Sequence, residues 1–126
     1  DGRRVIGTAR LWNIVCGTGQ SALLLGPVAV AADCRNRSVG AALVGHTLAA
    51  ARRRGHAAVV LVGDAPYYSR FGFSTEKTAA LRMPGPFERD RLLALELVPG
   101  SLNGARGLLR APSKRMPQTG LAASAA

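Results

Sequence analysis

The residues best suited to chemistry lie in a short arginine-rich turn between an apolar segment and a helical pattern. The turn runs from Arg35 to Gly40 and reads RNRSVG. A turn that leads into a helix presents unpaired backbone N–H groups, and the helix dipole adds positive charge at the same point. Such an end suits an anion, phosphate above all, and the small residues Ser38 and Gly40 allow it to approach closely. The sequence predicts an anion site here, and a tight turn that binds nothing is the competing interpretation.

A second group of chemical interest is the tyrosine pair Tyr67–Tyr68. It stands in a short predicted helix that opens with Asp64 as the cap and Pro66 in the first turn. A phenol with a pKa of about 10 is protonated at neutral pH, so it can donate a proton without tuning. The alternative is structural, with one tyrosine in the core and the other at the surface.

Both stretches resemble motifs of one enzyme family, the GNAT acetyltransferases. The run Arg35-x-x-Ser38-x-Gly40-Ala41 is similar to the family's pyrophosphate loop, written Q/R-x-x-G-x-G/A. Further along, the run from Tyr67 to Phe73 resembles its Y-x-x-x-G-F ending. Ser38 replaces the first glycine of the loop, and serine is small enough for the loop to form. The chain thus resembles a GNAT N-acetyltransferase without the usual N-terminal strand and helices.

The resemblance implies transfer of an acetyl group from acetyl-CoA to a primary amine that attacks the thioester directly. Tyr68 would be the catalytic acid that protonates the departing thiolate, and the backbone N–H of Val28 would hold the oxyanion. Tyr67 is interpreted as a packing residue. No general base is assigned, and Asp64 and Glu76 are the nearest acidic residues in the sequence. The residues expected to bind acetyl-CoA are Val28, Ala29, Val30, Arg35, Asn36, Arg37, Ser38, Val39, Gly40 and Ala41.

Two other classes of function stay open. A GNAT-like domain that binds acyl-CoA as a sensor, without turnover, would carry the same motifs. A basic nucleic-acid-binding protein is the second class, because the net charge is +10, with 17 basic and 7 acidic residues. The arginines are scattered, however, and no helix-turn-helix, zinc or RNA-binding signature is visible. These features argue against nucleic acid as the main partner.

The elements that must position these residues alternate between strand and helix. An apolar strand, Leu23–Val30, carries Gly26-Pro27 in its middle, which predicts a bulge. A helix is expected from Val39 to just before Gly55, followed by a buried strand over Ala57–Val62. Strand, helix and strand in this order form a parallel crossover. The expected fold is α/β (α+β), a GNAT-like mixed β-sheet with a bulged strand, a central crossover helix and a splayed parallel strand pair.

The remaining sequence predicts shorter elements around this unit. Cys16–Gln20 is expected to form a hairpin loop, and strands are expected over Thr75–Met83 and Leu92–Val98. Residues 1–110 would form one acyl-CoA-binding domain that is incomplete at its N-terminus. Residues 111–126 lack hydrophobic periodicity and are predicted to be a disordered or loosely attached tail.

The sequence predicts no metal site. His46 and His56 have no metal-ligand spacing, and the same holds for Cys16 and Cys34. Free thiols favour a reducing, cytoplasmic setting. No apolar run is long enough for a membrane span, and no signal peptide pattern opens the chain. The expected partners are acetyl-CoA and an unidentified amine acceptor, and the family resemblance adds a possible homodimer.

Overall fold

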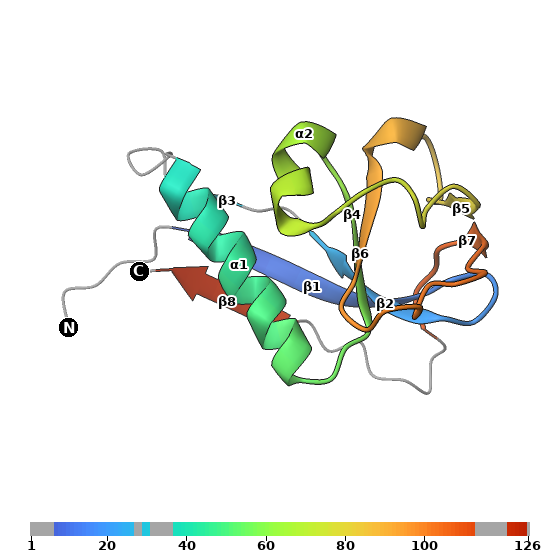
Figure 1. Cartoon of the computed structure of the whole chain (residues 1–126), viewed down its shortest axis with the longest axis horizontal. Helices are drawn as coiled ribbons and strands as arrows, with labels where there is room; N and C mark the ends of the chain where they lie inside the picture. Colours follow the sequence, from blue (N-terminus) through green and yellow to red (C-terminus); the bar gives the residue numbers. More distant parts are fainter. Residues whose placement is uncertain (1–6, 27–28, 31–36, 113–120, 126) are drawn as a thin grey trace.

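A mixed sheet crossed by one long helix forms the frame of the chain (Figure 1). The computed structural model describes residues 7–26, 29–30, 37–112 and 121–125. Strand β1 pairs with β2, β3 and β8, and β2, β4 and β6 follow one another across the sheet. This arrangement confirms the predicted mixed α/β fold.

The sheet begins with a hairpin of β1 (Gly7–Val15) and β2 (Ser21–Leu25). The two strands pair antiparallel from Leu11–Leu25 to Val15–Ser21. The loop between them closes when the Cys16 N–H donates to the Gln20 carbonyl at 2.8 Å. The hairpin loop predicted at these residues is therefore confirmed.

The predicted bulge follows from the register of β1 with β3 (Ala29–Val30). Leu11 faces Leu25, whereas Thr8 faces Ala29, so three steps along β1 correspond to four steps along the partner segment. One extra residue therefore lies between Leu25 and Ala29, which defines a bulge. Because β8 occupies the other edge of β1 at Thr8, β3 continues along the same edge as β2.

The central crossover consists of α1 (Arg37–Arg53), which leads from this bulged segment to β4 (Ala58–Val62). The helix begins two residues earlier than the pattern predicts. It ends before Gly55, whose φ of 82° is left-handed and favours glycine. Strand β4 pairs in parallel with β2, at Leu23–Val59 and Leu24–Val60, as predicted.

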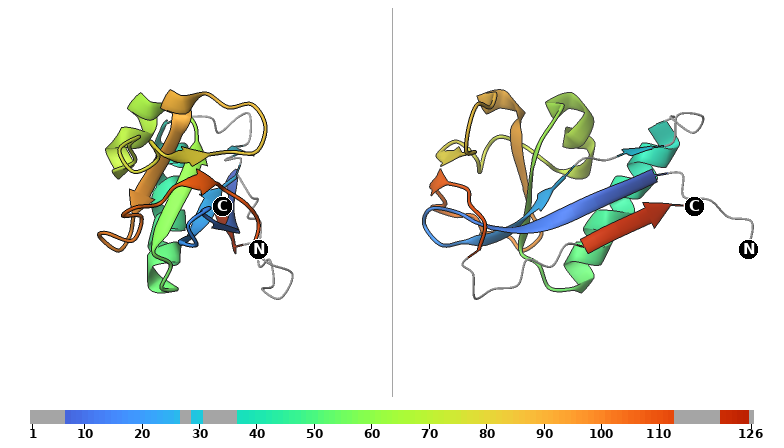
Figure 2. Two further views of the ribbon diagram at one scale, coloured as in Figure 1. Left: turned by 90° about the vertical axis from the view of Figure 1, so that its right-hand side faces the viewer. Right: turned by 180° about the vertical axis from the view of Figure 1, so that it is seen from behind.

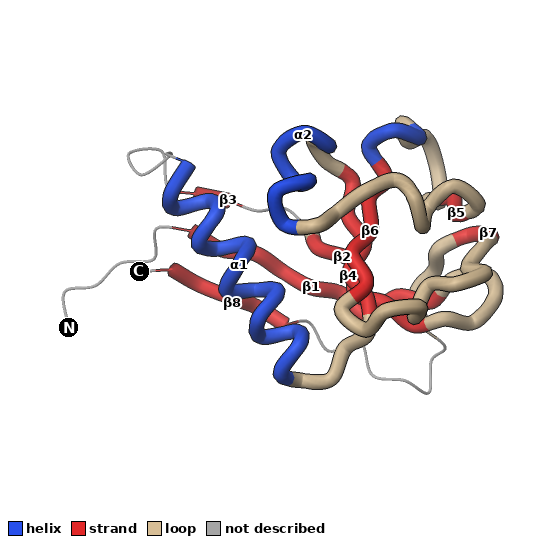
Figure 3. Tube along the Cα trace, viewed as in Figure 1, coloured by secondary structure: helices blue, strands red, loops and turns tan. Residues whose placement is uncertain are grey.

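Two layers of side chains cover the faces of the sheet. On one face lies α1, seen in front of β1 and β8 in Figure 1 and behind them in the right-hand view of Figure 2. The opposite face of β4 and β6 is covered mainly by loops around β5 (Leu81–Arg82) and β7 (Gly107–Leu108), as Figure 3 shows. The first layer contains Leu11, Leu23, Leu43, Val44, Leu61 and Leu93. The second contains Ile14, Val60, Leu81, Leu92, Leu102 and Leu109.

The strand predicted over Thr75–Met83 is wrong for most of its length. Only Leu81–Arg82 is a strand, and turns precede it. The buried Thr78 explains the difference, since its hydroxyl contacts the Thr75 carbonyl at 3.2 Å and the Leu92 carbonyl at 2.6 Å. Threonine hydroxyls that bond to nearby backbone favour turns over ladders. The second predicted strand is confirmed in shorter form as β6 (Leu92–Glu96), which pairs antiparallel with β4.

The C-terminal segment also differs from the sequence interpretation. Within the predicted tail, β8 (Leu121–Ala125) pairs antiparallel with β1. Backbone groups at a strand edge can pair with any extended segment, whatever its side chains, and this explains why apolar periodicity did not indicate it.

The tyrosine pair lies on α2 (Ala65–Tyr68), which continues as the 3₁₀ turn η2 (Ser69–Phe71). Asp64 occupies the N-cap position of α2, although its side chain makes no cap hydrogen bond. The segment ends at Gly72, where φ is 95° and a Cβ would lie 3.0 Å from the Leu95 Cδ1. The glycine of the Y-x-x-x-G-F motif is therefore required by its backbone conformation and by this close contact.

Alanine at two glycines should change stability in opposite directions. Gly72→Ala should lower the free energy of unfolding by about 1–2 kcal/mol, because a left-handed conformation costs an L-residue that much. Gly45→Ala should raise the free energy of unfolding by about 0.5–1 kcal/mol. Gly45 is exposed in the middle of α1, and no atom lies within 4 Å of its Cβ position. Urea denaturation measures both values. A Gly72→Ala protein as stable as the parent would contradict this account of the motif glycine.

Candidate functional site

A cavity opens where the parallel strands β2 and β4 stop pairing. The last paired residues are Leu24 and Val60, and the next residues, Leu25 and Leu61, line the cavity. Its volume is about 300 Å³. Apart from Tyr68, its walls carry no polar side chain, and the full lining is Leu24, Leu25, Gly26, Leu61, Val62, Tyr68 and Met83. Such a site suits a slender, uncharged chain rather than an ion.

Tyr68 is the one chemically reactive side chain in this lining. Its ring is half-buried and packs edge-on against Phe73, with centroids 5.9 Å apart. The ring also lies on the backbone of Gly63, where a Cβ would stand only 2.6 Å from the Tyr68 Cε2. Glycine at position 63 thus leaves the space in which the Tyr68 ring lies against the backbone.

The electrostatic surroundings keep the Tyr68 hydroxyl protonated. Burial raises its pKa above the ordinary value of 10.0, and the neighbouring Tyr67 and the Asp64 carboxylate raise it further. A tyrosinate would be poorly solvated here and would face a negative charge. The hydroxyl can therefore donate a proton to an anion that forms in the cavity at neutral pH.

The bulged side of the cavity offers backbone groups rather than side chains. Gly26 lines the cavity, and a Cβ there would lie 3.0 Å from the Trp12 Nε1, so glycine keeps this wall open. Among the described strands, β3 pairs with β1 alone, which leaves the other edge of Ala29 and Val30 unpaired. Neither residue is part of the cavity lining, and their pairing with a ligand stays a prediction. Val28 lies outside the described residues.

The predicted anion loop leads into the first turn of α1. Arg37, Ser38 and Val39 form that turn, followed by Gly40 and Ala41, and the turn contains no acidic residue. Arg35 and Asn36 lie outside the described residues. A Cβ on Gly40 would stand 3.2 Å from the hydroxyl oxygen of Tyr67. The helix start and the tyrosine pair are therefore neighbours in space, although they are far apart in the sequence.

The acidic residues considered as a general base occupy different places. Asp64 is exposed at the start of α2, and its charge acts on Tyr68. Glu76 lines a separate depression with Lys77 and Asn103, so it does not belong to the cavity. Within the described residues no cluster of His, Cys, Asp or Glu could hold a metal ion. None of the described helices has the length and apolarity that crossing a bilayer needs.

Several residues of this site were missed by sequence reasoning. Gly63 follows the predicted strand 57–62, and nothing in that position predicts its contact with the Tyr68 ring. Met83 reaches the cavity from the segment after β5, and Trp12 approaches it from β1. No local pattern marks Met83 or Trp12, since both arrive through long-range packing. The only signal that the sequence offers for Gly63 is its position directly before the helix cap Asp64.

The Tyr68 hydroxyl should titrate above its ordinary range, and Asp64 should control part of the shift. Tyr67 and Tyr68 are the only tyrosines of the chain, so a Tyr67→Phe background leaves Tyr68 alone to report in an ultraviolet absorbance titration. Asp64→Asn should then move the midpoint to lower pH, because removal of a negative charge makes tyrosinate easier to form. Asp90→Asn, at an exposed site in the 3₁₀ turn η3 (Arg89–Arg91), should leave it unchanged. An unmoved midpoint in Asp64→Asn would refute this role of Asp64.

The support that Gly63 gives to Tyr68 has its own test. Gly63→Ala should displace the ring towards solvent, so the Tyr68 midpoint should fall towards the ordinary value. Forcing a methyl group into this contact should also lower the free energy of unfolding by about 1–3 kcal/mol. Gly45→Ala serves as the matched control, since it adds the same methyl group in open space. Identical titrations of the parent and Gly63→Ala would show that the ring does not depend on this glycine.

Comparison with known proteins identifies the architecture. The profile of the acetyltransferase (GNAT) domain matches residues 1–75. Over 85 residues, the chain is 34% identical to the uncharacterized N-acetyltransferase YhbS of Escherichia coli K12, covering 68% of this chain and 51% of that protein. The chain therefore spans about half the length of this curated relative.

Two solved structures show the same fold. The crystal structure of Escherichia coli YhbS in complex with CoA matches with a TM-score of 0.77 and 31% identity, covering 86% of this chain and 61% of that one. A GNAT family acetyltransferase from Brucella melitensis, in complex with acetyl-CoA, matches with a TM-score of 0.67 and 24% identity, covering 90% and 62%. Family profile, relative and fold agree, and the chain belongs to the GNAT acetyltransferase family.

Proposed function

We propose that this chain is an acetyl-CoA-dependent N-acetyltransferase that acetylates a primary amine by direct attack. The observation that carries the proposal is the apolar cavity at the parted ends of β2 and β4, with the protonated Tyr68 in its wall. Membership of the GNAT family supports it. A cytoplasmic location and a homodimer stay predictions from the sequence.

The described residues fit the parts of acetyl-CoA. The cavity takes the thioester end of the pantetheine arm, because its walls are apolar. The unpaired edge of β3 offers the N–H and C=O groups of Ala29 and Val30 to the amides of that arm. The first turn of α1 presents backbone N–H groups to the pyrophosphate, and that turn contains no acidic residue. The likeness to YhbS, whose crystal structure contains CoA, supports this placement.

The reaction needs one proton donor at the sulfur. The lone pair of the amine attacks the thioester carbonyl carbon and forms the new C–N bond, and the C–S bond breaks as the carbonyl re-forms. Tyr68 gives its proton to the departing sulfur, and the attacking nitrogen loses one proton to its surroundings. The raised pKa of Tyr68 suits this role, because the hydroxyl is fully protonated before transfer. The oxyanion role of the Val28 N–H stays a prediction from the family resemblance.

The arrangement favours turnover over a purely sensing role. A sensor needs the cavity and the helix start, but it has no need for a proton donor at the thioester end. The Tyr68 ring occupies the space that a side chain at position 63 would need, so this position must remain glycine. This place in the cavity wall supports the proposal that Tyr68 takes part in the reaction.

The test separates binding from chemistry. Titration with acetyl-CoA, followed by the fluorescence of Trp12, the only tryptophan, should show saturable binding. Ser38→Glu should abolish binding, because it sets a carboxylate against the phosphates. Tyr68→Phe should bind normally but lower kcat by about 10²–10⁴-fold, the usual contribution of a general acid. Thiol release with a panel of primary amines measures kcat.

Two controls make the outcome decisive. A carboxylate in the first turn stabilises a helix, so Ser38→Glu should remain folded, as circular dichroism will show. His46→Glu places the same charge at an exposed position in the middle of α1 and should bind normally. Failure of the folded parent to bind acetyl-CoA would overturn the proposed function. Full thiol release by Tyr68→Phe would remove Tyr68 from the mechanism.

A further inference from the structure

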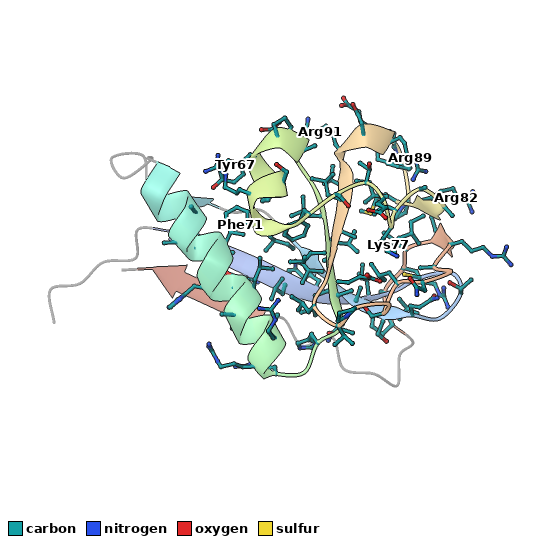
Figure 4. The ribbon with its side chains drawn as sticks, viewed as in Figure 1. Tyr67, Phe71, Lys77, Arg82, Arg89 and Arg91 are labelled. Atoms are coloured by element: carbon teal, nitrogen blue, oxygen red, sulfur yellow. The ribbon has the colours of Figure 1, made fainter. Side chains whose placement is uncertain are left out.

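The segment of α2 and η2 carries a tyrosine–arginine pair, Tyr67 and Arg70, that the proposed reaction does not use. Tyr67 directly precedes the catalytic acid, and Figure 4 shows it on the side of α2 that faces α1. A Cβ on Gly40, in α1, would stand 3.2 Å from the Tyr67 hydroxyl oxygen. Among the described residues this hydroxyl has no hydrogen-bond partner. A polar group is therefore available beside the start of the helix.

Arg70 is held against the same tyrosine by two contacts. Its Nε donates to the Tyr67 carbonyl at 3.0 Å, and its guanidinium lies over the Tyr67 ring, 4.5 Å from the centroid. Within the part of the chain that the structure describes, no carboxylate pairs with Arg70. The terminal guanidinium nitrogens keep their charge and their donors, and the ring reduces the entropy that the side chain would lose on binding a ligand.

The Tyr67 hydroxyl lies beside Gly40 in α1, and the Arg70 guanidinium rests on the ring of the same tyrosine. The backbone of α1 supplies neutral N–H donors, while Tyr67 and Arg70 add a hydroxyl and a full positive charge from α2. Phosphate binds best where several donors and a guanidinium converge. The edge-on contact of Tyr67 with Tyr68, at 5.0 Å between centroids, joins this pair to the reacting tyrosine.

We propose that Tyr67 and Arg70 clamp a phosphate group of the coenzyme from the α2 side. The inference rests on the proposed function and adds a specificity element to it, since the clamp selects coenzymes that carry nucleotide phosphates over bare pantetheine thioesters. Tyr67 and Arg70 act in binding, and Tyr68 acts in the chemical step. Two adjacent tyrosines therefore have separable roles.

Affinity measurements with two ligands test the clamp. Arg70→Gln should weaken acetyl-CoA binding about tenfold, as expected for loss of a charged hydrogen bond, and Tyr67→Phe should weaken it about threefold. Both should bind S-acetylpantetheine, which lacks the nucleotide phosphates, as the parent does. KM for acetyl-CoA should rise with kcat unchanged, the reverse of the result expected for Tyr68→Phe. Arg52→Gln, at the far end of α1, is the matched control and should leave the affinity for both ligands unchanged.

A double-mutant cycle tests whether the pair acts as one unit. Tyr67→Ala removes the ring on which the guanidinium rests, so Arg70→Gln should cost much less in that background than in the parent. With dephospho-acetyl-CoA, loss of the Arg70→Gln effect would assign the clamp to the 3′-phosphate, and its persistence would assign it to the pyrophosphate.

The outcomes separate this inference from the proposed function. If the parent does not bind acetyl-CoA, the proposed function fails and the clamp fails with it. Two results would overturn the clamp alone while the parent binds acetyl-CoA. Folded Arg70→Gln could bind acetyl-CoA as tightly as the parent, or it could lose affinity for S-acetylpantetheine to the same extent as for acetyl-CoA. Additive losses in the cycle would contradict the pairing of Tyr67 with Arg70.

Discussion

The site depends on the point at which two parallel strands stop pairing. Strands β2 and β4 are held together only as far as Leu24 and Val60, and the extra residue after Leu25 sets the bulged segment on a different register along β1. A strand cannot keep its ladder to both neighbours across such a bulge. The cavity, the free edge of β3 and the helix start that follows all result from this break.

Glycines set the shape of the cavity from opposite sides. Gly63 leaves the space that the Tyr68 ring fills, and Gly26 keeps a side chain from filling the gap beside Trp12. A substitution at either position would act by displacing a neighbour rather than by removing a functional group. Close packing transmits such displacements, because protein interiors leave few voids to absorb them. The Tyr68 ring is thus positioned partly by a residue that has no functional group of its own.

The strong positive charge of the chain is only partly explained by a phosphate-bearing ligand. Arg70 contributes to the proposed coenzyme site, whereas Arg52 and Arg53 lie at the opposite end of α1, where positive charge stabilises the helix dipole. Arg89 donates to the Thr78 carbonyl at 2.6 Å and stacks on Phe87, so its role is structural. The arginines thus have several local functions, which agrees with the absence of a single basic stripe in the sequence.

The sequence by itself determined the bulge, the crossover helix and the parallel strand that follows it, because each has a local cause. Proline and glycine mark the bulge, apolar spacing marks α1, and Gly72 within the Y-x-x-x-G-F motif takes the left-handed conformation that favours glycine. The tertiary structure alone decided which distant residues meet. Tyr67 reaches Gly40, Gly63 supports Tyr68, and β8 pairs with β1, and no short-range pattern records these contacts. Thr75–Ala80 failed as a strand for the same reason, since Thr78 is satisfied by a carbonyl of β6. Local pattern fixes backbone preference, while the site arises from packing between segments that are far apart in the chain.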